Sequence, residues 1–313
     1  MNQTSREDTN NKDSHMNNSD DPPKQEINLQ FHWYFLSFFL IFLGSFLIPG
    51  ILLTLYIIYF YYPYLLSTNA FILIFIKPRP LLASVFLPLV IMGCYVLHLL
   101  MVGVITRGLW GITEKNSPSK EGIIPRNIQS KTLNYYHIRS FMIKYPKNAF
   151  IKGPFPWLLN WFYNFVGTNK IGKGTTIEEQ FGADKFVEMG EDCYIGVNSG
   201  FSSHSLEGIF GNLSYFKIKL GDNVTTGGIN CVAPGAEIKD NSYLFPLASA
   251  TKHSKLRGDN YYFGLPLRRT TNRKTKKYLD VTKEELNKAD VLKSEKKEQH
   301  KSPSKIDKGV ENG

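Results

Sequence analysis

A six-residue periodicity between Ile171 and Lys252 constrains the fold of this chain more than any other feature of its sequence. An aliphatic or small residue opens nearly every block of six, and glycine often follows it, at positions 172, 190, 196, 221 and 227. The fifth place often holds a small residue: Thr175, Cys193, Ser199, Ala236, Ser242 and Ala248. The register holds from 171 to 201, slips by one residue across an interruption at 207–219, and resumes from 220 to 250.

This period is typical of a parallel β-helix, in which each block makes one flat face and three blocks make one triangular coil. The opening residue points inward, where only the neighbouring coils can cover it, so the coils must stack. Glycine in the second place suits a corner that needs unusual dihedral angles or a close backbone approach. We therefore predict a parallel β-helix of about four coils over 171–252. The alternative is a chance alternation of glycine and apolar residues in another β protein.

The repeat resembles that of the hexapeptide-repeat acyltransferases, whose blocks build a left-handed parallel β-helix. The resemblance covers about 171–268 and implies the same all-β fold for the C-terminal part of this chain. It is less specific for activity, because the same helix also occurs in proteins that are not transferases.

Two apolar runs, Phe31–Tyr62 and Leu81–Thr106, contain no Asp, Glu, Lys or Arg. A membrane-spanning helix needs about 20 such residues, so we predict transmembrane helices at about 33–62 and 81–106. Aromatic residues at both ends of the first run suit interfacial belts. Residues 65–76 are too few to span comfortably and favour an interfacial or re-entrant segment. His98, inside the second helix, is either a functional polar group or a hydrogen-bond partner of a neighbouring helix.

Flanking basic residues predict the orientation of this region in the cell membrane. Beyond the second helix lie Arg107, Lys115, Lys120 and Arg126, whereas only Lys77 and Arg79 lie between the two helices. The positive-inside rule then places the β-helix domain in the cytoplasm. With two spans, the N-terminal tail is cytoplasmic as well.

The remaining segments are expected to connect or flank these two parts. Residues 1–30 are polar without apolar periodicity and predict a disordered tail that is not a secretory signal. Residues 108–170 form an amphipathic connector, in which Trp157–Val166 either lies in the headgroup plane or caps the β-helix. Residues 270–313 form a basic charged tail that anionic lipids would attract. The net charge is +10, yet acids are interleaved and aromatics scarce in this tail, so no nucleic-acid partner is expected.

The residues around the interruption are the candidate site. His204 is the only histidine within the regular coils, and Glu207 follows three residues later. A histidine can act as a general base near neutral pH, and a nearby carboxylate would fix its tautomer. Backbone N–H groups around Ser202–Ser203 or Gly227–Gly228 are candidates for holding an oxyanion. The alternative is a surface histidine with an unrelated charged neighbour; His253, where the repeat stops, is expected to be structural.

The order of motifs also resembles a more specific family. RGLWG, EGIIPRN, YYHIRSF and WLLNWFYNFVG precede the repeat, and SHSLEG and YYFGLPLRR complete it. Over about 80–269 this is similar to the membrane-embedded C-terminal domains of poly-lysine synthetase and related non-ribosomal peptide synthetases. His204 and Glu207 match the family's His-x-x-Glu, and Gly264 and Pro266 match its closing Gly-x-Pro. The resemblance implies peptide-bond formation, although this chain has one such unit and no adenylation or carrier domain.

These observations predict a membrane-bound acyl or aminoacyl transferase. The donor is expected to be a thioester of coenzyme A or of a carrier protein, and the acceptor an amine or a hydroxyl. No metal or tightly bound cofactor is required. The three cysteines have no zinc-type spacing and are not expected to form a disulfide. Membrane lipids are expected partners, and a homo-oligomer is compatible with the fold. The alternative function is a non-catalytic scaffold anchored to the membrane.

Overall fold

The computed structural model describes residues 31–66, 71–126, 128–178, 181–182, 185–208, 211–265 and 267–269, together with Thr282 and Glu284. The predicted N-terminal tail, Pro266 and all but two residues of the predicted basic tail lie outside this part of the chain.

Parallel strands spaced by 18 residues confirm the predicted stacking of coils. Lys170 pairs with Glu188, Lys219 with Glu237, and Glu237 with Lys255. The face that these residues share, called the β2 face, contains β2 (Lys170–Ile171), β5 (Val187–Met189), β10 (Ile218–Leu220), β13 (Glu237–Ile238) and β16 (Lys255–Leu256). A spacing of 18 residues is three blocks of six, so each coil has three faces.

The other two faces follow the same spacing. The β3 face contains β3 (Thr176–Ile177), β6 (Tyr194–Ile195), β11 (Thr225–Thr226), β14 (Tyr243–Leu244) and β17 (Tyr261–Phe263), and β18 (Arg268–Arg269) pairs antiparallel with β17. The β4 face contains β4 (Phe181–Gly182), β7 (Gly200–Phe201), β12 (Cys231–Val232) and β15 (Ser249–Ala250). The coils therefore continue past Lys252, where the sequence pattern fades, as far as Phe263.

Among the described residues, the opening residues of the blocks point into the prism. Buried side chains stack in columns along the three faces: Ile171, Met189, Leu220, Ile238 and Leu256; Ile195, Thr226, Leu244 and Tyr262; Phe201, Val232 and Ala250. The small fifth-place residues are buried too, each at most 5% exposed. The six-residue period thus marks the residues that point into the β-helix. Each coil can bury these apolar residues only against the neighbouring coils.

The second-place glycines serve close backbone approach. A Cβ on Gly196 would lie 2.5 Å from the carbonyl oxygen of Thr226 and 2.6 Å from the nitrogen of Gly228, in the next coil. The left-handed corners are instead occupied by other residues, among them Asn198, Asn223 and Asn241, whose φ angles lie between 55° and 56°. Of the two roles open to these glycines, close packing is the one that this structure uses.

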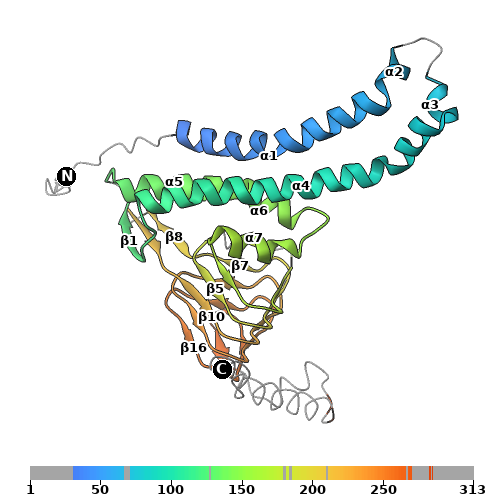
Figure 1. The fold of residues 1–313 in the computed structure, drawn as a ribbon. Coiled ribbons are helices and arrows are strands. Elements are labelled where there is room, and N and C mark those ends of the chain that lie inside the picture. Colours follow the sequence, from blue (N-terminus) through green and yellow to red (C-terminus); the bar gives the residue numbers. More distant parts are fainter. Residues whose placement is uncertain are drawn as a thin grey trace, which may run out of the picture.

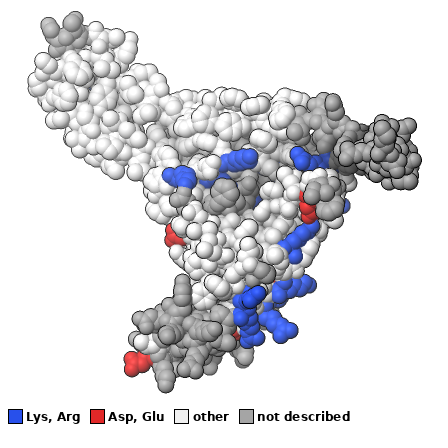
Figure 2. Space-filling model, turned by 180° about the vertical axis from the view of Figure 1, so that it is seen from behind, with Lys and Arg blue, Asp and Glu red and all other residues white. Residues whose placement is uncertain are grey.

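Two long helices form an arm beside the wide end of the β-helix (Figure 1). They are α1 (Phe31–Phe60) and α4 (Pro78–Asn116), joined through the short helices α2 (Tyr62–Leu65) and α3 (Leu73–Ile76). Both long helices are apolar and long enough to cross a membrane, and only 17% of the most apolar window of each is buried. In Figure 2 the visible face of the projecting part of the arm shows no Lys, Arg, Asp or Glu, while Lys and Arg lie on the body beneath it.

Three further helices fill the space between the arm and the coils: α5 (Lys131–Met142), α6 (Lys144–Ile151) and α7 (Leu158–Val166). Tyr34, predicted to be an interfacial residue, is buried instead and stacks on Phe141 of α5, with ring centroids 4.8 Å apart. His98 of α4 lies 3.0 Å from the hydroxyl of Tyr145 in α6, measured from Nε2. This contact agrees with the second role considered for His98, that of a hydrogen-bond partner of a neighbouring helix.

Helix α7 caps the first coil. Leu159, Phe162 and Tyr163 are buried in the same core as the inward column of the β2 face. Asn164 receives a hydrogen bond from the N–H of Ile171 and donates one to its carbonyl oxygen, both at 2.8 Å. The opposite side of α7 touches α4, since a Cβ on Gly103 would lie 3.1 Å from the ring of Trp161. The cap is therefore present, and it lies against a candidate membrane helix.

Candidate functional site

A β-hairpin leaves the β-helix at one corner. Each coil turns from the β4 face to the β2 face there, and this turn is called the hairpin corner. Glu188 and Lys219 are paired although 31 residues separate them, 13 more than the usual 18. Those residues include β8 (His204–Glu207) and β9 (Asn212–Tyr215), which pair antiparallel with each other. Strand β1 (Gly122–Pro125) adds to the far side of β9.

The hairpin starts earlier than the break in the repeat suggests. The interruption predicted at 207–219 begins in the structure at His204, the first residue of β8. Ile209 and Phe210, which stand between β8 and β9 in the sequence, lie outside the described residues. His204 is thus the first strand residue after the coil corner, at the root of the hairpin and facing the helices above it.

The imidazole of His204 lies against α5. Its side chain is half-buried, and its ring centroid is 5.7 Å from that of Tyr136 in an edge-to-face arrangement. Directly across the hairpin from His204 is Tyr215, whose ring also packs edge-to-face on Tyr136 at 5.5 Å. Since aromatic pairs favour this geometry, Tyr136 fixes the position of the His204 ring between the hairpin and α5.

Glu207 points away from His204. Successive strand residues face opposite sides of a sheet, so residues three apart on β8 cannot share a face. The Glu207 carboxylate accepts hydrogen bonds from Lys252 Nζ at 2.7 Å and from the hydroxyl of Ser214 at 2.8 Å. Lys252, and then Ser214, hold the pKa of this carboxyl below its usual range. The structure therefore places Glu207 where it anchors the hairpin to the coils rather than where it contacts the imidazole.

The backbone donors proposed for an oxyanion are largely engaged. The N–H of Ser202 donates to Val232 O at 2.9 Å, that of Gly227 to Leu244 O at 2.8 Å, and that of Gly228 to Asn230 Oδ1 at 3.0 Å. Within the described residues, the N–H of Ser203 makes no such bond. Its side chain is buried and donates to Lys185 O at 2.8 Å.

Gly227 and Gly228 also lie at a different corner from His204. They join β11 of the β3 face to β12 of the β4 face, whereas Ser202 and Ser203 follow β7 at the hairpin corner. The structure therefore brings Ser202, Ser203 and His204 together and leaves the two glycines apart. Residues on one corner of the helix are separated by multiples of 18. Gly227 lies 23 residues after His204, and subtracting the 13 inserted residues leaves 10, so the two residues do not share a corner.

His253, expected to be structural, occupies an exposed turn at the hairpin corner with φ of 57°. Its ring packs edge-to-face on Phe216, at the base of the hairpin, with centroids 4.5 Å apart. Gly264, which matched the closing motif, has φ of 83° between β17 and β18, a conformation that favours glycine.

Two residues that sequence reasoning missed lie close to His204. His137 follows Tyr136 on α5, and burial followed by the charges of Lys185, Arg126 and His204 lowers its pKa. Lys185 is only 2% exposed, and its Nζ lies 3.9 Å from the centre of the Tyr136 ring. The same Nζ donates to Ser140 Oγ at 2.8 Å. His137 belongs to the motif YYHIRSF, which was noted in the sequence. Nothing in that motif indicated that His137 lies close to His204, 67 positions later.

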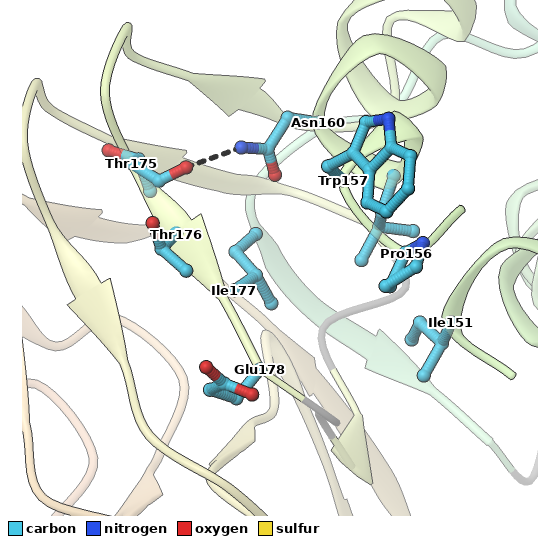
Figure 3. A pocket seen from close by; sticks show the side chains of 9 residues that line it. Ile151, Pro156, Trp157, Asn160, Thr175, Thr176, Ile177 and Glu178 are labelled. Carbon is cyan, nitrogen blue, oxygen red and sulfur yellow. Dashed lines mark hydrogen bonds between the residues drawn. The ribbon is translucent and has the colours of Figure 1, made fainter. Parts of the chain in front are cut away.

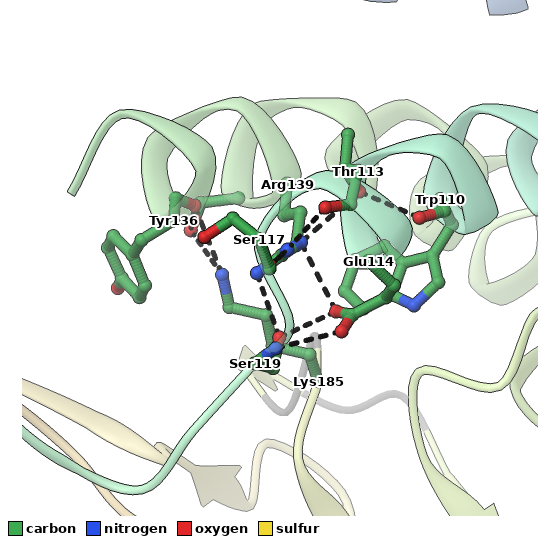
Figure 4. Close-up of polar contacts among 9 residues, drawn as sticks. Trp110, Thr113, Glu114, Ser117, Ser119, Tyr136, Arg139 and Lys185 are labelled. Carbon is green, nitrogen blue, oxygen red and sulfur yellow. Dashed lines mark hydrogen bonds and ion pairs between the residues drawn. The ribbon is translucent and has the colours of Figure 1, made fainter. Parts of the chain in front are cut away.

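A buried arginine holds α5 in place (Figure 4). Arg139 is 3% exposed and forms an ion pair with Glu114 of α4 at 3.2 Å. Its guanidinium also donates to the carbonyl oxygens of Thr113 and Ser117 and to the hydroxyl of Ser119. These bonds tie the end of α4 and the segment leading to β1 to the helix that carries Tyr136 and His137.

A separate pocket of about 370 Å³ lies between β3 and the start of α7 (Figure 3). Trp157 and Glu178 line it, and Asn160 crosses its edge to donate to Thr175 O at 2.5 Å. Because it opens beside the β3 face, it contains none of the site residues predicted from the sequence. Among the described residues, no group of three or more His, Cys, Asp or Glu side chains is placed to hold a metal.

The solved structures that resemble this chain include acyltransferases. No protein-family model matches the chain, and no curated protein matches it significantly. A maltose O-acetyltransferase from Clostridium difficile 630 aligns at 14% identity with a TM-score of 0.31, over 54% of this chain and 87% of the other. A hexapeptide-repeat acetyltransferase from Vibrio cholerae aligns at 15% identity with a TM-score of 0.32, over 54% and 91%.

A galactoside acetyltransferase in complex with coenzyme A gives 18% identity and a TM-score of 0.28, over 54% of this chain and 81% of the other. At these TM-scores the neighbours carry no argument about function, and the β-helix of this chain is established by its own pairing of coils.

Proposed function

We propose that this chain is a membrane-bound acyltransferase with His204 as its general base. The observation that carries the proposal is the place of His204. It is a half-buried imidazole at the root of a hairpin, held against Tyr136 where coil and helical layer meet. A histidine side chain can serve as a general base, and His204 follows Ser203, whose N–H is the remaining candidate for an oxyanion donor.

In the proposed reaction, the acceptor amine or hydroxyl gives its proton to His204 as it attacks the carbonyl carbon of an acyl thioester. The N–H of Ser203 stabilises the tetrahedral oxyanion. The C–S bond then breaks, and the leaving thiolate takes the proton from the imidazolium. Glu207 contributes indirectly, because its bond to Lys252 fixes the hairpin on which His204 lies.

The donor in this proposal is a thioester of coenzyme A or of a carrier protein. With an aminoacyl donor and an amine acceptor, the same steps form a peptide or isopeptide bond, as the resemblance to poly-lysine synthetase domains implies. No step in the sequence of proton transfers calls for a metal ion.

Membrane attachment in this proposal is provided by α1 and α4. At 1.5 Å per residue the 39 residues of α4 extend for about 58 Å, which exceeds a hydrocarbon core of about 30 Å. The last turns of α4 therefore extend beyond the bilayer and carry the Arg139 network. The flanking basic residues favour a cytoplasmic position for this end and for the β-helix.

The test is acyl and aminoacyl transfer by purified protein in detergent, with a panel of thioester donors and of amine and hydroxyl acceptors. His204→Ala should lower turnover by about 10²–10⁴-fold, as expected for loss of a general base, with unchanged circular dichroism. His32→Ala, at an exposed position of α1, is the matched control and should retain turnover within a few fold. Full turnover by His204→Ala with a substrate pair that the wild type accepts would exclude His204 as the base.

A non-catalytic scaffold is the second candidate. The observation that favours it is that the carboxylate of Glu207 binds Lys252 and Ser214, leaving it no direct role at the imidazole. Under this alternative, no donor and acceptor of the panel give product with the wild-type protein, and His204→Ala leaves cellular function intact.

A further inference from the structure

A groove of about 600 Å³ runs between the start of α1, the end of α4 and α5. Its volume lies in the range of about 300–1,000 Å³ typical of small-molecule sites. Its walls come from Trp33, Leu36 and Leu40 of α1 and from Leu109 and Ile112 of α4. The groove lies on the other side of α5 from β1 and the hairpin, because Tyr135 and Ile138 face it while Tyr136 packs on the hairpin.

The walls of the groove are open as well as apolar. Trp33 is 48% exposed, Leu36 and Leu40 are each 47% exposed, and Ile112 is 59% exposed. Four large apolar side chains around one groove form a surface that suits an apolar ligand rather than water. The same apolar surface continues along α1 and α4 toward the tip of the arm, where many exposed residues are Leu, Ile or Phe. A ligand from a bilayer can therefore enter sideways without crossing water.

One end of the groove is polar and positively charged. Gln129, Ser130, Lys131 and Asn134 line it at the beginning of α5. Gln129 donates to the side-chain oxygen of Asn134 at 3.1 Å, and Ser130 accepts from the N–H of Leu133. Lys131 is the one charged residue among the described groove residues, and its Nζ lies 6.0 Å from the centre of the Tyr135 ring. The polar end therefore favours a negatively charged group.

The position of the groove along the two helices agrees with this polarity. Trp33 is in the first turn of α1, and Leu109 and Ile112 lie beyond Thr106, where the second predicted span ends. If α1 and α4 cross the bilayer, the groove lies at the boundary between acyl chains and headgroups, where tryptophan and lysine side chains are favoured.

We propose that the groove binds one anionic phospholipid of the bilayer, with an acyl chain along Trp33, Leu36 and Ile112 and the phosphate at Lys131. The proposal rests on the membrane attachment put forward under the proposed function, and it is independent of the chemistry at His204. Such a lipid would fill the space between α5 and the arm, and so would brace the helix that carries Tyr136 and His137.

The experiment is native mass spectrometry of detergent-purified protein, to which phosphatidylglycerol or phosphatidylcholine is added in equal amounts. Wild type should retain one phosphatidylglycerol per chain at detergent levels that strip phosphatidylcholine. Ile112→Trp, which fills the groove, should lower that occupancy at least tenfold. Lys131→Glu should remove the preference for the anionic lipid. Leu89→Trp, on an exposed site of α4 away from the groove, and Lys120→Glu, at an exposed basic site, should match the wild type.

Equal retention of the two lipids by wild type, or full retention of phosphatidylglycerol by Ile112→Trp, would overturn the proposal. Leu40→Trp provides a second way to fill the groove if Ile112→Trp does not fold, as judged by circular dichroism. Lipid binding is measured from the mass of the protein–lipid complex, and acyl transfer from the amount of product formed. The two proposals can therefore fail separately. His204→Ala should keep the lipid adduct whether or not it loses transfer.

Discussion

Lys252 Nζ lies 2.7 Å from Glu207 Oε1, although 45 residues separate the two in the chain. The same ammonium donates to Ser214 Oγ at 2.6 Å, so one lysine at a coil corner contacts both strands of the hairpin. Phe216 at the hairpin base packs on His253, the next residue of that corner. The hairpin that begins with His204 is therefore fixed from below by the coils and from above by Tyr136.

Replacing Lys252 with Met should loosen the hairpin without unfolding the β-helix. Both partners are partly exposed to solvent, and an ion pair at such a position contributes little to stability. Displacement of His204 by about 1 Å can nevertheless cost roughly 100-fold in rate. We expect transfer to fall about 10–100-fold with little change in melting temperature. Lys170→Met, which removes a more exposed partner of Glu188, is the control and should leave transfer unchanged.

Acid should have the same effect as Lys252→Met. The pKa of Glu207 is held below its usual range by Lys252 first and then by Ser214. The stabilisation is therefore complete above the unfolded pKa of about 4.3, and it is lost as the pH falls through the lower folded pKa. Limited proteolysis at the hairpin should increase over that range in the wild type. In Lys252→Met it should already be high at pH 7, and equal protection of the two proteins at pH 7 would contradict the anchoring role.

Arg139→Met should be strongly destabilising. This arginine is 3% exposed and its partner Glu114 is 30% exposed, so the loss should fall below the roughly 3–5 kcal/mol that breaking a fully buried pair costs. The measurement is the free energy of unfolding by denaturant in detergent. Arg269→Met, at an exposed position of β18, should change it by less than about 0.5 kcal/mol. The double variant Arg139→Met with Glu114→Gln should recover part of the loss, because no carboxylate is then left without its cation.

His137 should titrate below the ordinary histidine value of about 6.5. Burial is the main cause of its lowered pKa, and the charges of Lys185, Arg126 and His204 add to it. The unfolded chain therefore binds this proton more readily, so stability falls as the pH drops from about 6.5 toward the folded pKa. Lys185→Met should raise the pKa of His137, as measured by NMR titration of labelled histidine. A pKa that Lys185→Met leaves unchanged would show that this charge does not act on His137.

The coils could be predicted from the sequence, whereas the site could be predicted only in part. Each inward residue is repeated every 18 positions, so the pattern itself reports which residues stack. In the hairpin, successive side chains alternate between the two faces of the sheet. The sequence indicated only where the six-residue period stops. Neither the opposite directions of His204 and Glu207 nor the bond to Lys252 could be read from a motif of four residues.

The environment of His204 depends on long-range packing. Tyr136, which contacts His204 and Tyr215, comes from a helix whose amphipathic pattern is short, and it lies 68 residues before His204 in the chain. The candidate oxyanion donors at Gly227 and Gly228 lie at another corner than His204, which the sequence could not show because the 13-residue insertion interrupts the count of six. Local patterns therefore pointed to His204 as the candidate base, and the tertiary structure supplied its neighbours.

Gly196→Ala should destabilise the β-helix. A Cβ there would lie 2.5 Å from Thr226 O and 2.6 Å from Gly228 N, and neither backbone atom can move without shifting a coil. Overpacking of this kind costs about 1–3 kcal/mol. Gly208→Ala is the matched control in the hairpin, since a Cβ there would meet nothing within 4 Å. Thermal unfolding followed by circular dichroism should separate the two variants; equal melting temperatures would show that the coils can adjust their spacing.

The arm should behave as a membrane anchor whose β-helix lies in the cytoplasm. Alkaline carbonate should leave the protein in the membrane fraction, because α1 and α4 expose apolar side chains along lengths of about 45 and 58 Å. Cys231 is an exposed thiol on β12 and reports the side of the membrane. An impermeant maleimide should label it only after permeabilisation, and Lys77→Cys, between the two helices, should be labelled in intact cells. Cys231→Ser gives the background. Labelling of Cys231 in intact cells would reverse the orientation, and release by carbonate would exclude the anchor.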